Sequence, residues 1–546
     1  MKSNHARSTR TAIGAGAMLA AILIFAGALP APAQTFKTLV NFNNTNGDQP
    51  VNATLVQGQN GDLYGTTYLA GAHGNGQVFK MTPAGVISTV YSFCSLAACD
   101  DGDAPAAPLL LGADGNLYGT TRYQGTGGCG VVFKLTPAGV YTVLHAFVNT
   151  DGCYPTIGLM QASNNLFYGA TPAGGSAGYG TLYQVSSTGA FKVIHNFDGT
   201  VAGGGVPGGS PIQATNGNLY GGTVAPGQSV IYQTNLAGTV FHTYPFSASN
   251  ADVSGPLIQA SNGNIYGTTS FAPGYGTFFR VTPAGVITTL YSFCSLTNCA
   301  DGSQPVDGVI QASDGNFYGT TYRGGANNAG TIFKITAAGV LTTLHSFDVT
   351  DGENIDSGIF QNTNGTLYGV THNGGTDSVG TVYSLTNKLP AFVHTITPGG
   401  AVGARVVILG NTLKGATAVS FNGTAATFTV VSATEITTTV PAGATTGKIK
   451  VTTPTATFNT DKTYRVTPKL TSFTPPSGAV GTSVTITGVS FTQTTKVTFG
   501  GIAATSFTVN SDTQVTATVP TGAVSGKIVV TTPGGSASST TNFTVN

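Results

Sequence analysis

Two pairs of neighbouring arginine and tyrosine residues are the strongest candidates for ligand chemistry in this sequence. Arg122 precedes Tyr123 and Tyr322 precedes Arg323, and each pair directly follows an L-Y-G-T-T or F-Y-G-T-T segment. A tyrosine ring offers an apolar face with a polar tip, and a guanidinium offers several fixed hydrogen-bond donors. Such groups hold sugars or polar peptides, so we interpret both pairs as ligand-binding residues.

Two aspartates, Asp101 and Asp301, belong to the same set of candidates. Each stands before a glycine in a loop that begins with C-S-L-x-x-C. A carboxylate accepts hydrogen bonds from hydroxyl groups, which adds to the predicted site. The alternative is that all six residues are solvated loop residues. Because no two acidic groups, and no base and cation, visibly converge, we assign no catalytic residue, metal ligand or cofactor.

Six cysteines form the other chemically distinctive set. Cys94 and Cys99 share their local pattern with Cys294 and Cys299, which predicts two short local disulfides. Cys129 and Cys153 then remain to pair with each other. Disulfides of this kind are expected in an exported chain.

The first 33 residues have the pattern of a secretory signal peptide. Positive charges at Lys2, Arg7 and Arg10 precede an apolar stretch, and Ala31-Pro32-Ala33 offers a cleavage site. We predict removal of residues 1–33 and a secreted, periplasmic or cell-surface location. An uncleaved membrane anchor is the alternative, and no later segment is long and apolar enough to span a membrane.

The composition is that of a weakly charged, turn-rich globular protein. Of 546 residues, 77 are glycine, 40% are hydrophobic and only 8% are charged. The net charge of +1 becomes −2 without the three basic residues of the signal. Nucleic acid and anionic membranes are therefore poor partners, and a glycan or a surface protein is the better expectation.

A repeat of about fifty residues positions the candidate residues. Each unit has a short apolar run, an N-G or D-G turn, an L-Y-G segment, a Gly-rich loop, a G-T-V-F-K-I-T segment, a P-A-G turn and a final V-x-T-x-L-Y-S-F segment. The tyrosine of the L-Y-G segment marks seven units, at Tyr64, Tyr118, Tyr168, Tyr220, Tyr266, Tyr318 and Tyr368. Four strands per unit predict the blades of a seven-bladed β-propeller over residues 34–388.

The two ends of the repeat region predict how it closes. The seventh unit lacks its fourth strand, and residues 36–42 supply the missing pattern at the N-terminus. We therefore expect the N-terminal strand to complete the last blade and to leave no open sheet edge. The tight turns then share one face, and the longer loops, with all the candidate residues, share the other.

The segments D/N-G-N-L-Y-G-T-T and G-T-V-F-K-I-T-P-A-G resemble those of the choice-of-anchor tandem repeat, or GloVer-type, family over about residues 35–388. That family carries no established chemistry to transfer. After Pro390 two further segments, 391–466 and 467–546, run in parallel: V-V-I-L-G-N at 406–411 matches V-T-I-T-G-V at 484–489. Both resemble IPT/TIG domains, which implies two immunoglobulin-like β-sandwiches acting as spacers or binding modules.

Three functions remain open on these grounds. The first is a secreted or cell-surface binding or adhesion protein whose ligand, possibly a carbohydrate, lies on the long-loop face. The second is an extracellular polysaccharide-active hydrolase or lyase, and the third is a structural surface component. Fold analogy does not decide among them.

Overall fold

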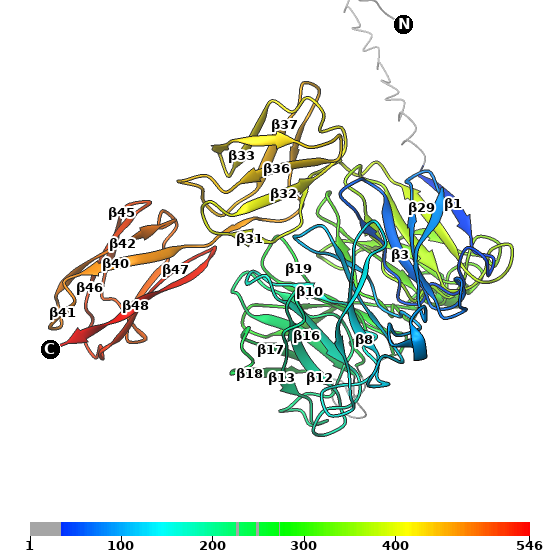
Figure 1. The fold of residues 1–546 in the computed structure, drawn as a ribbon, viewed down its shortest axis with the longest axis horizontal. Coiled ribbons are helices and arrows are strands. Elements are labelled where there is room, and N and C mark those ends of the chain that lie inside the picture. The colour runs from blue at the N-terminus through cyan, green and yellow to red at the C-terminus, as the bar shows by residue number, and fades with distance from the viewer. Residues whose placement is uncertain (1–33, 225–228, 247–250, 272–273) are drawn as a thin grey trace, which may run out of the picture. The chain divides into compact units, whose positions relative to one another are not determined.

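The computed structural model describes residues 34–224, 229–246, 251–271 and 274–546, so the predicted signal peptide lies outside it (Figure 1). The described chain is all-β, with only two 3₁₀ turns, η1 (Ala97–Cys99) and η2 (Thr297–Cys299). None of its helical segments is long and apolar enough to cross a membrane.

The described part of the repeat region contains seven antiparallel sheets, which we number 1 to 7 in chain order. Sheet 1 consists of β2 (Val56–Gln57), β3 (Leu63–Thr67), β4 (Gln77–Met81) and β5 (Ile87–Ser92). Sheet 2 consists of β6 (Leu110–Leu111), β7 (Leu117–Thr121), β8 (Val131–Leu135) and β9 (Tyr141–Ala146). Sheet 3 consists of β10 (Met160–Gln161), β11 (Phe167–Thr171), β12 (Thr181–Val185) and β13 (Phe191–Asn196). Sheet 4 has five strands, β14 (Val206–Pro207), β15 (Ile212–Gln213), β16 (Leu219–Val224), β17 (Val230–Thr234) and β18 (Phe241–Pro245).

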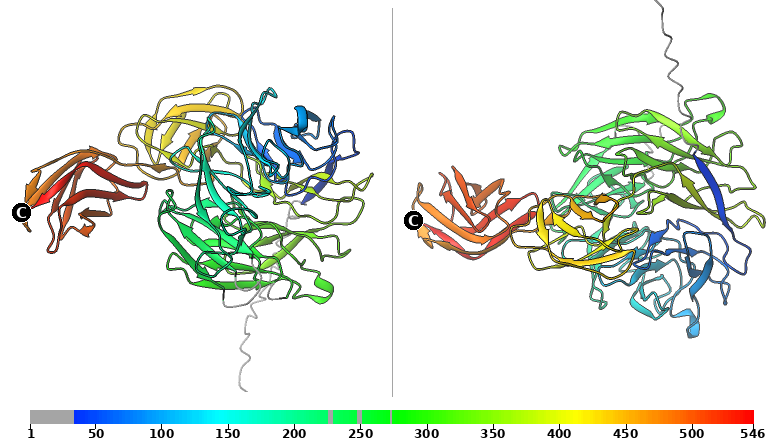
Figure 2. Two further views of the ribbon diagram at one scale, coloured as in Figure 1. Left: turned by 60° about the horizontal axis from the view of Figure 1, so that its bottom comes forward. Right: turned by 90° about the horizontal axis from the view of Figure 1, so that it is seen from above.

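Sheets 5 and 6 repeat the four-strand order: β19 (Ile258–Gln259), β20 (Ile265–Thr269), β21 (Thr277–Val281) and β22 (Ile287–Ser292), then β23 (Ile310–Gln311), β24 (Phe317–Thr321), β25 (Thr331–Ile335) and β26 (Leu341–Ser346). Sheet 7 has β27 (Phe360–Gln361), β28 (Leu367–Thr371) and β29 (Thr381–Thr386). Its fourth strand is β1 (Thr35–Asn41), which pairs antiparallel with β29 from Thr35 opposite Thr386 to Asn41 opposite Thr381. The two strands lie side by side in Figures 1 and 2.

Burial explains why the second and third strands are so uniformly small or apolar. All five residues of β7 are buried, and in β8 only Lys134 is partly exposed. Both faces of these strands pack against neighbouring sheets, so strict alternation of polar and apolar residues is lost. Sheet 7 and sheet 1 share one apolar core, in which Val40 and Val382 lie with Leu63 and Phe79.

Glutamine side chains link consecutive sheets at the inner strands. The Oε1 atom of the glutamine that ends the first strand accepts a hydrogen bond from the backbone N–H of a turn residue in the preceding sheet. The six pairs are Ala113 with Gln161, Ser163 with Gln213, Thr215 with Gln259, Ser261 with Gln311, Ser313 with Gln361 and Thr363 with Gln57. The last pair joins sheet 7 to sheet 1, so the first and last sheets are neighbours.

Two sandwiches follow, each with two sheets around one apolar core. The first sandwich has strands β30 (His394–Thr395), β32 (Arg405–Leu409), β36 (Glu435–Thr439) and β35 (Phe428–Val430) in one sheet and β34 (Thr424–Ala426), β33 (Ala418–Phe421), β37 (Ile449–Thr452) and β38 (Thr457–Asn459) in the other. A parallel pair, β31 (Gly399–Gly400) and β39 (Arg465–Val466), completes it.

The second sandwich repeats this strand order. One sheet has β40 (Lys469–Thr474), β42 (Ser483–Val489), β46 (Gln514–Thr518) and β45 (Phe507–Ser511). The other has β41 (Ser477–Gly478), β48 (Gly535–Val545), β47 (Gly526–Thr532), β43 (Lys496–Phe499) and β44 (Ile502–Ala503). The matching order agrees with the internal repeat of the sequence.

The first sandwich packs against the tight-turn ends of several of the seven sheets. The Arg465 guanidinium donates to the Ala214 carbonyl oxygen (2.9 Å) and to Gln213 Oε1 (2.8 Å) of sheet 4. The Thr434 hydroxyl donates to the Gln59 carbonyl oxygen of sheet 1 (2.7 Å). Leu409 joins the apolar core that contains Leu111. The first sandwich therefore contacts the repeat sheets through both hydrogen bonds and a shared apolar core.

Candidate functional site

The long loops connect the second strand of each sheet to the third, and the fourth strand to the next sheet. In an antiparallel sheet both connections emerge at the end opposite the tight turns. We call this end the long-loop face. The structure places all six predicted ligand-binding residues in its loops, but it gives them different roles.

Arg122 and Tyr123 follow β7 and lie against each other. The Arg122 Cζ atom is 4.9 Å from the centroid of the Tyr123 ring, a cation–π distance. The ring of Tyr154, from the loop after β9, meets the Tyr123 ring edge-on with centroids 5.5 Å apart. These aromatic contacts fix the orientation of Tyr123.

Tyr68 joins this group from the equivalent position after β3. Burial raises the pKa of the Tyr68 hydroxyl, and the Arg122 guanidinium beside it works in the opposite direction. Tyr123 also lies near this hydroxyl and raises its pKa further. We call Tyr68, Arg122, Tyr123 and Tyr154 the arginine–tyrosine group. Tyr68 is not among the predicted residues, although it directly follows L-Y-G-T-T, as Arg122 and Tyr322 follow theirs.

Three buried polar atoms in these loops lack a partner. Arg122 Nε, Asp48 Oδ1 and Asp103 Oδ1 are buried without a hydrogen-bond partner among the described residues. The Asp103 N–H donates to the Tyr123 carbonyl oxygen (3.1 Å), and the Tyr68 N–H donates to the Gln49 carbonyl oxygen (2.9 Å). The backbone of Asp103 therefore lies against Tyr123, and that of Gln49, which follows Asp48, lies against Tyr68. A buried donor or acceptor left unpaired is costly, and a polar ligand would offset that cost.

Tyr322 and Arg323 form a similar pair after β24. The Arg323 Cζ atom is 5.4 Å from the centroid of the Tyr322 ring, and Arg323 is exposed. The Tyr322 N–H donates to the Gln304 carbonyl oxygen (2.9 Å), just as Tyr68 donates to Gln49. Within the described residues, no hydrogen bond or ring contact joins this pair to the arginine–tyrosine group. The two predicted pairs are therefore separate on the face.

Asp101 and Asp301 do not face a ligand, which corrects their predicted role. Both side chains are fully buried. Asp301 Oδ2 accepts hydrogen bonds from the Tyr291 hydroxyl (2.7 Å) and the Ser295 N–H (2.9 Å), and Oδ1 accepts one from the Leu296 N–H (3.1 Å). Burial alone would raise the pKa of Asp301, but these donors lower it. Asp101 has the same partners in its own loop, so both carboxylates order the loop around them.

Three disulfides stiffen the long-loop face. The structure pairs Cys94 with Cys99, Cys129 with Cys153, and Cys294 with Cys299, which are the pairs expected from the sequence. The second of them ties the loop between β7 and β8 to the loop after β9. Tyr154, a member of the arginine–tyrosine group, directly follows Cys153.

An acid–base group at His372 was missed from the sequence. His372 follows β28, at the position that Tyr68 and Tyr322 hold in their own sheets. Its Nδ1 atom lies 2.7 Å from Asp356 Oδ2. Burial opposes protonation, but Asp356 and Asp48 outweigh it and raise the pKa of His372. Burial also raises the pKa of Asp48. We call Asp48, Asp356 and His372 the histidine–aspartate group.

Close-packed backbone lies behind these groups. A side chain at Gly255 would overlap the Gly308 nitrogen, and one at Gly308 would overlap the Pro256 oxygen. Glycine is therefore required at both positions because the segments before the first strands touch. Burial here raises the pKa of the Asp307 carboxyl to about 6, although the Gly308 N–H (2.7 Å) donates to it.

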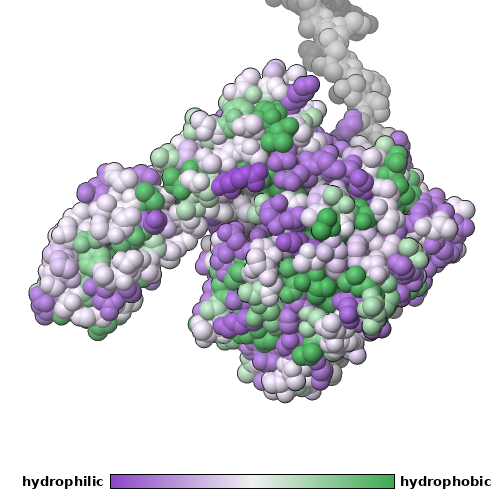
Figure 3. All heavy atoms as spheres, in the orientation of Figure 1, coloured by the Kyte–Doolittle hydropathy of each residue, from purple (hydrophilic) through white to green (hydrophobic). Residues whose placement is uncertain are grey.

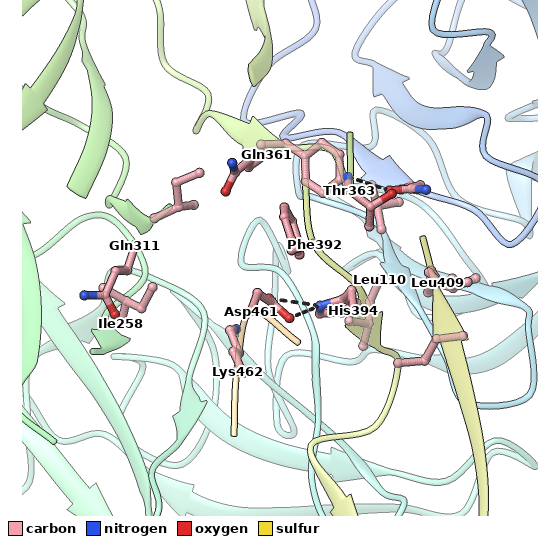
Figure 4. A pocket seen from close by; sticks show the side chains of 16 residues that line it. Leu110, Ile258, Gln311, Gln361, Thr363, Phe392, His394, Leu409, Asp461 and Lys462 are labelled. Atoms are coloured by element: carbon pink, nitrogen blue, oxygen red, sulfur yellow. Dashed lines mark hydrogen bonds and ion pairs between the residues drawn. The ribbon is translucent and has the colours of Figure 1, made fainter. Parts of the chain in front are cut away.

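A cavity of about 240 Å³ lies at the opposite, tight-turn end (Figure 4). Its walls are the first strands of sheets 1, 2, 5, 6 and 7 and the adjoining side of the first sandwich. On the sandwich side, His394 Nδ1 lies 3.0 Å from both carboxylate oxygens of Asp461. Burial opposes ionisation, but His394, Lys462 and Lys448 lower the pKa of Asp461 to about 2. No feature of the sequence indicated this cavity.

Comparison with known families identifies the repeats. The model of the Gloeobacter/Verrucomicrobia repeat matches residues 28–230 and 222–431, and the chain belongs to that family. The IPT/TIG domain model matches residues 468–545, which is the second sandwich. The prediction of two IPT/TIG domains was therefore one too many: the first sandwich has the same strand order, but the repeat model reaches into it. No curated protein matches the chain.

Solved structures show only distant likenesses. The chain is 13% identical to the extracellular domain of BT3049 from B. thetaiotaomicron, with 92% of this chain and 64% of that one covered and a TM-score of 0.45. It is 19% identical to the surface glycan-binding protein PbSGBP-B from Prevotella bryantii, with 28% and 41% covered and a TM-score of 0.23. A fungal alcohol oxidase of the AA5 family gives 11% identity, 76% and 98% coverage and a TM-score of 0.43. The chain thus spans less than two thirds of the first two structures, and none is similar enough to carry a functional argument.

Proposed function

We propose that the protein is an exported binding protein that holds a polar ligand, with a carbohydrate as the favoured class, on its long-loop face. The observation that carries the proposal is the arginine–tyrosine group with its unpaired Arg122 Nε, Asp48 Oδ1 and Asp103 Oδ1 atoms. Aromatic faces and paired donors and acceptors suit the apolar and hydroxyl sides of a sugar ring. The disulfides favour binding because less loop entropy is lost.

The fold that we infer for the repeat region is a closed seven-bladed β-propeller, followed by two immunoglobulin-like sandwiches. The glutamine links, the β1–β29 pairing and the core shared by sheets 7 and 1 support the closed ring. We divide the chain at residues 34–388, 391–466 and 467–546, after a signal peptide at 1–33. Three disulfides and the signal pattern support an extracellular or periplasmic location.

The mixture of polar and apolar residues on the surface suits a soluble ligand better than a large protein partner with an extended apolar surface. On the face drawn in Figure 3, hydrophobic residues form small patches separated by polar ones. A large obligate partner would need a broader apolar surface. The glycan-binding likeness of PbSGBP-B is compatible with this view but contributes nothing to it at so low a TM-score.

The test is a glycan and cell-wall array probed with the mature chain and three variants. Tyr123→Ala removes the aromatic face of the arginine–tyrosine group and is expected to weaken binding at least tenfold, the scale of a lost aromatic contact. Tyr322→Ala reports on the second pair. Tyr179→Ala is the matched control, since Tyr179 is a 40% exposed tyrosine of a long loop in sheet 3. Binding that survives Tyr123→Ala, or that falls equally with Tyr179→Ala, would refute the site.

A polysaccharide-active enzyme is the second candidate, and the histidine–aspartate group favours it. A histidine with a raised pKa beside two carboxylates provides an acid and a base within one loop cluster. Product analysis of any bound glycan tests this function. Turnover that persists in Asp356→Asn would remove the group from consideration, and binding without turnover would leave the binding protein.

A further inference from the structure

We infer that the cavity between the repeat sheets and the first sandwich is a second ligand site, which takes a small, mainly apolar molecule carrying one hydrogen-bond-accepting oxygen. This site lies at the end opposite the long-loop face and is independent of the proposed function. Its volume of about 240 Å³ exceeds that of apolar cavities that hold a single benzene-sized ring.

The lining selects an apolar body for the ligand. The first strands of the contributing sheets present apolar side chains to the cavity, including Leu110, Leu111, Ile258, Ile310 and Phe360. The polar residues of the lining are Gln57, Gln311, Gln361, Thr363, His394, Asp461 and Lys462. The sandwich adds Phe392 and Leu409 (Figure 4). Sheets 3 and 4 have Met160 and Ile212 at the same position of the repeat, and neither residue lines the cavity. The cavity is therefore formed by sheets 1, 2, 5, 6 and 7 with the first sandwich, and it is not a general property of the repeat.

Gln57 supplies the polar feature that selects an acceptor. Its side chain is only 4% exposed and lines the cavity, and its Oε1 atom accepts the Thr363 N–H (3.2 Å). Its Nε2 atom has no hydrogen-bond partner among the described residues. The equivalent amides are all paired: Gln311 Nε2 donates to the Gly315 carbonyl oxygen (2.9 Å) and Gln361 Nε2 donates to the Ser313 hydroxyl (2.8 Å).

The tight turn of sheet 1 also differs in its contacts. In the other sheets the amide bonds to the tight turn or to the neighbouring turn residue, and the turn of sheet 1 contacts the first sandwich. The Thr434 hydroxyl donates to the Gln59 carbonyl oxygen, and Gln59 Nε2 lies 3.4 Å from Glu435 Oε1. Gln57 lines the cavity, so its unpaired amide donor would be satisfied by a carbonyl, ether or hydroxyl oxygen of a bound molecule.

The experiment compares tetrahydropyran with cyclohexane, two rings of the same shape of which only the first carries an acceptor. Their affinities for the full mature chain are measured by ligand-observed NMR titration. The ratio of the two affinities is then measured in Gln57→Met and in the control Gln311→Met, whose parent amide is already paired. Any change of cavity shape affects both ligands alike, so the ratio isolates the hydrogen bond.

We expect saturable binding of both rings and an affinity ratio that falls about fivefold in Gln57→Met but not in Gln311→Met. Filling the cavity with Ile258→Phe is expected to weaken both ligands at least tenfold, whereas Ile212→Phe, at the same position of sheet 4, leaves them unchanged. Absence of saturable binding at millimolar ligand, an equal ratio in all variants, or indifference to Ile258→Phe would each overturn the inference.

Discussion

Replacing Arg465 with methionine is expected to release the first sandwich from the seven sheets. Arg465 is only 5% exposed, and its guanidinium donates to the Ala214 carbonyl oxygen and to Gln213 Oε1 at 2.9 and 2.8 Å. Methionine keeps most of the apolar stem but removes both bonds. Hydrogen bonds from a charged donor contribute roughly 1.5–3 kcal/mol each. Taking the lower end of this range for the two bonds together, we expect a net loss of about 3 kcal/mol, or roughly a hundredfold in the docking equilibrium.

Hydrogen exchange at a distant part of the same contact measures this release. The Phe392 N–H donates to the Thr363 carbonyl oxygen of sheet 7 (3.0 Å), whereas Arg465 binds sheet 4. If the sandwich undocks as a unit, the Phe392 amide should exchange up to about a hundredfold faster. Lys450→Met, which removes an exposed charge from β37 of the same sandwich, serves as the control. Faster exchange confined to sheet 4, with Phe392 still protected, would refute cooperative docking.

Three further predictions concern the long-loop face. Asp301→Ala should lower the melting temperature and loosen the Cys294–Cys299 loop. Because the pKa of Asp301 is lowered in the folded protein, its contribution to stability should be present above the ordinary aspartate pKa and be lost as the pH falls through the folded value. Urea unfolding at several pH values measures this loss. His372 should titrate above its ordinary pKa in an NMR titration. Its contribution to stability should be complete below that ordinary pKa and be lost as the pH rises through the raised folded value. A His372 pKa that Asp356→Asn leaves unchanged would contradict the pairing. Removing the Cys129–Cys153 disulfide with two serines should cost about 3 kcal/mol of unfolding free energy, given its sequence separation of 24 residues, and an unaltered urea midpoint would argue against the bond.

The sheets could be predicted from the sequence because each unit repeats the same local signals. In the fifth unit the repeat pattern predicts strands over 256–260, 264–269 and 276–282. The last two correspond to β20 (Ile265–Thr269) and β21 (Thr277–Val281), and the first is shorter, at Ile258–Gln259. The fourth strands also pack through their histidines, since His145 stacks on Phe191 with ring centroids 3.5 Å apart.

The candidate site was predicted less well, for physical reasons. Nothing in the loop sequence distinguishes a carboxylate that faces solvent from one that accepts hydrogen bonds from its own loop, and Asp101 and Asp301 are of the second kind. Tyr68 and His372 were missed because their partners come from other segments of the chain. The contacts of the first sandwich could not be predicted for the same reason: Arg465 hydrogen-bonds to Gln213, which lies 252 positions away in the sequence.

The glutamine links have a consequence for where the chain can begin. The bond from Thr363 to Gln57 has the same donor and acceptor groups as the five bonds between sheets that are consecutive in sequence. The junction of the two ends is thus held by the same bond as five of the internal junctions, supplemented by β1. The repeat region should consequently tolerate circular permutation: new termini placed between other sheets, with the old ones joined, should leave the same set of bonds intact.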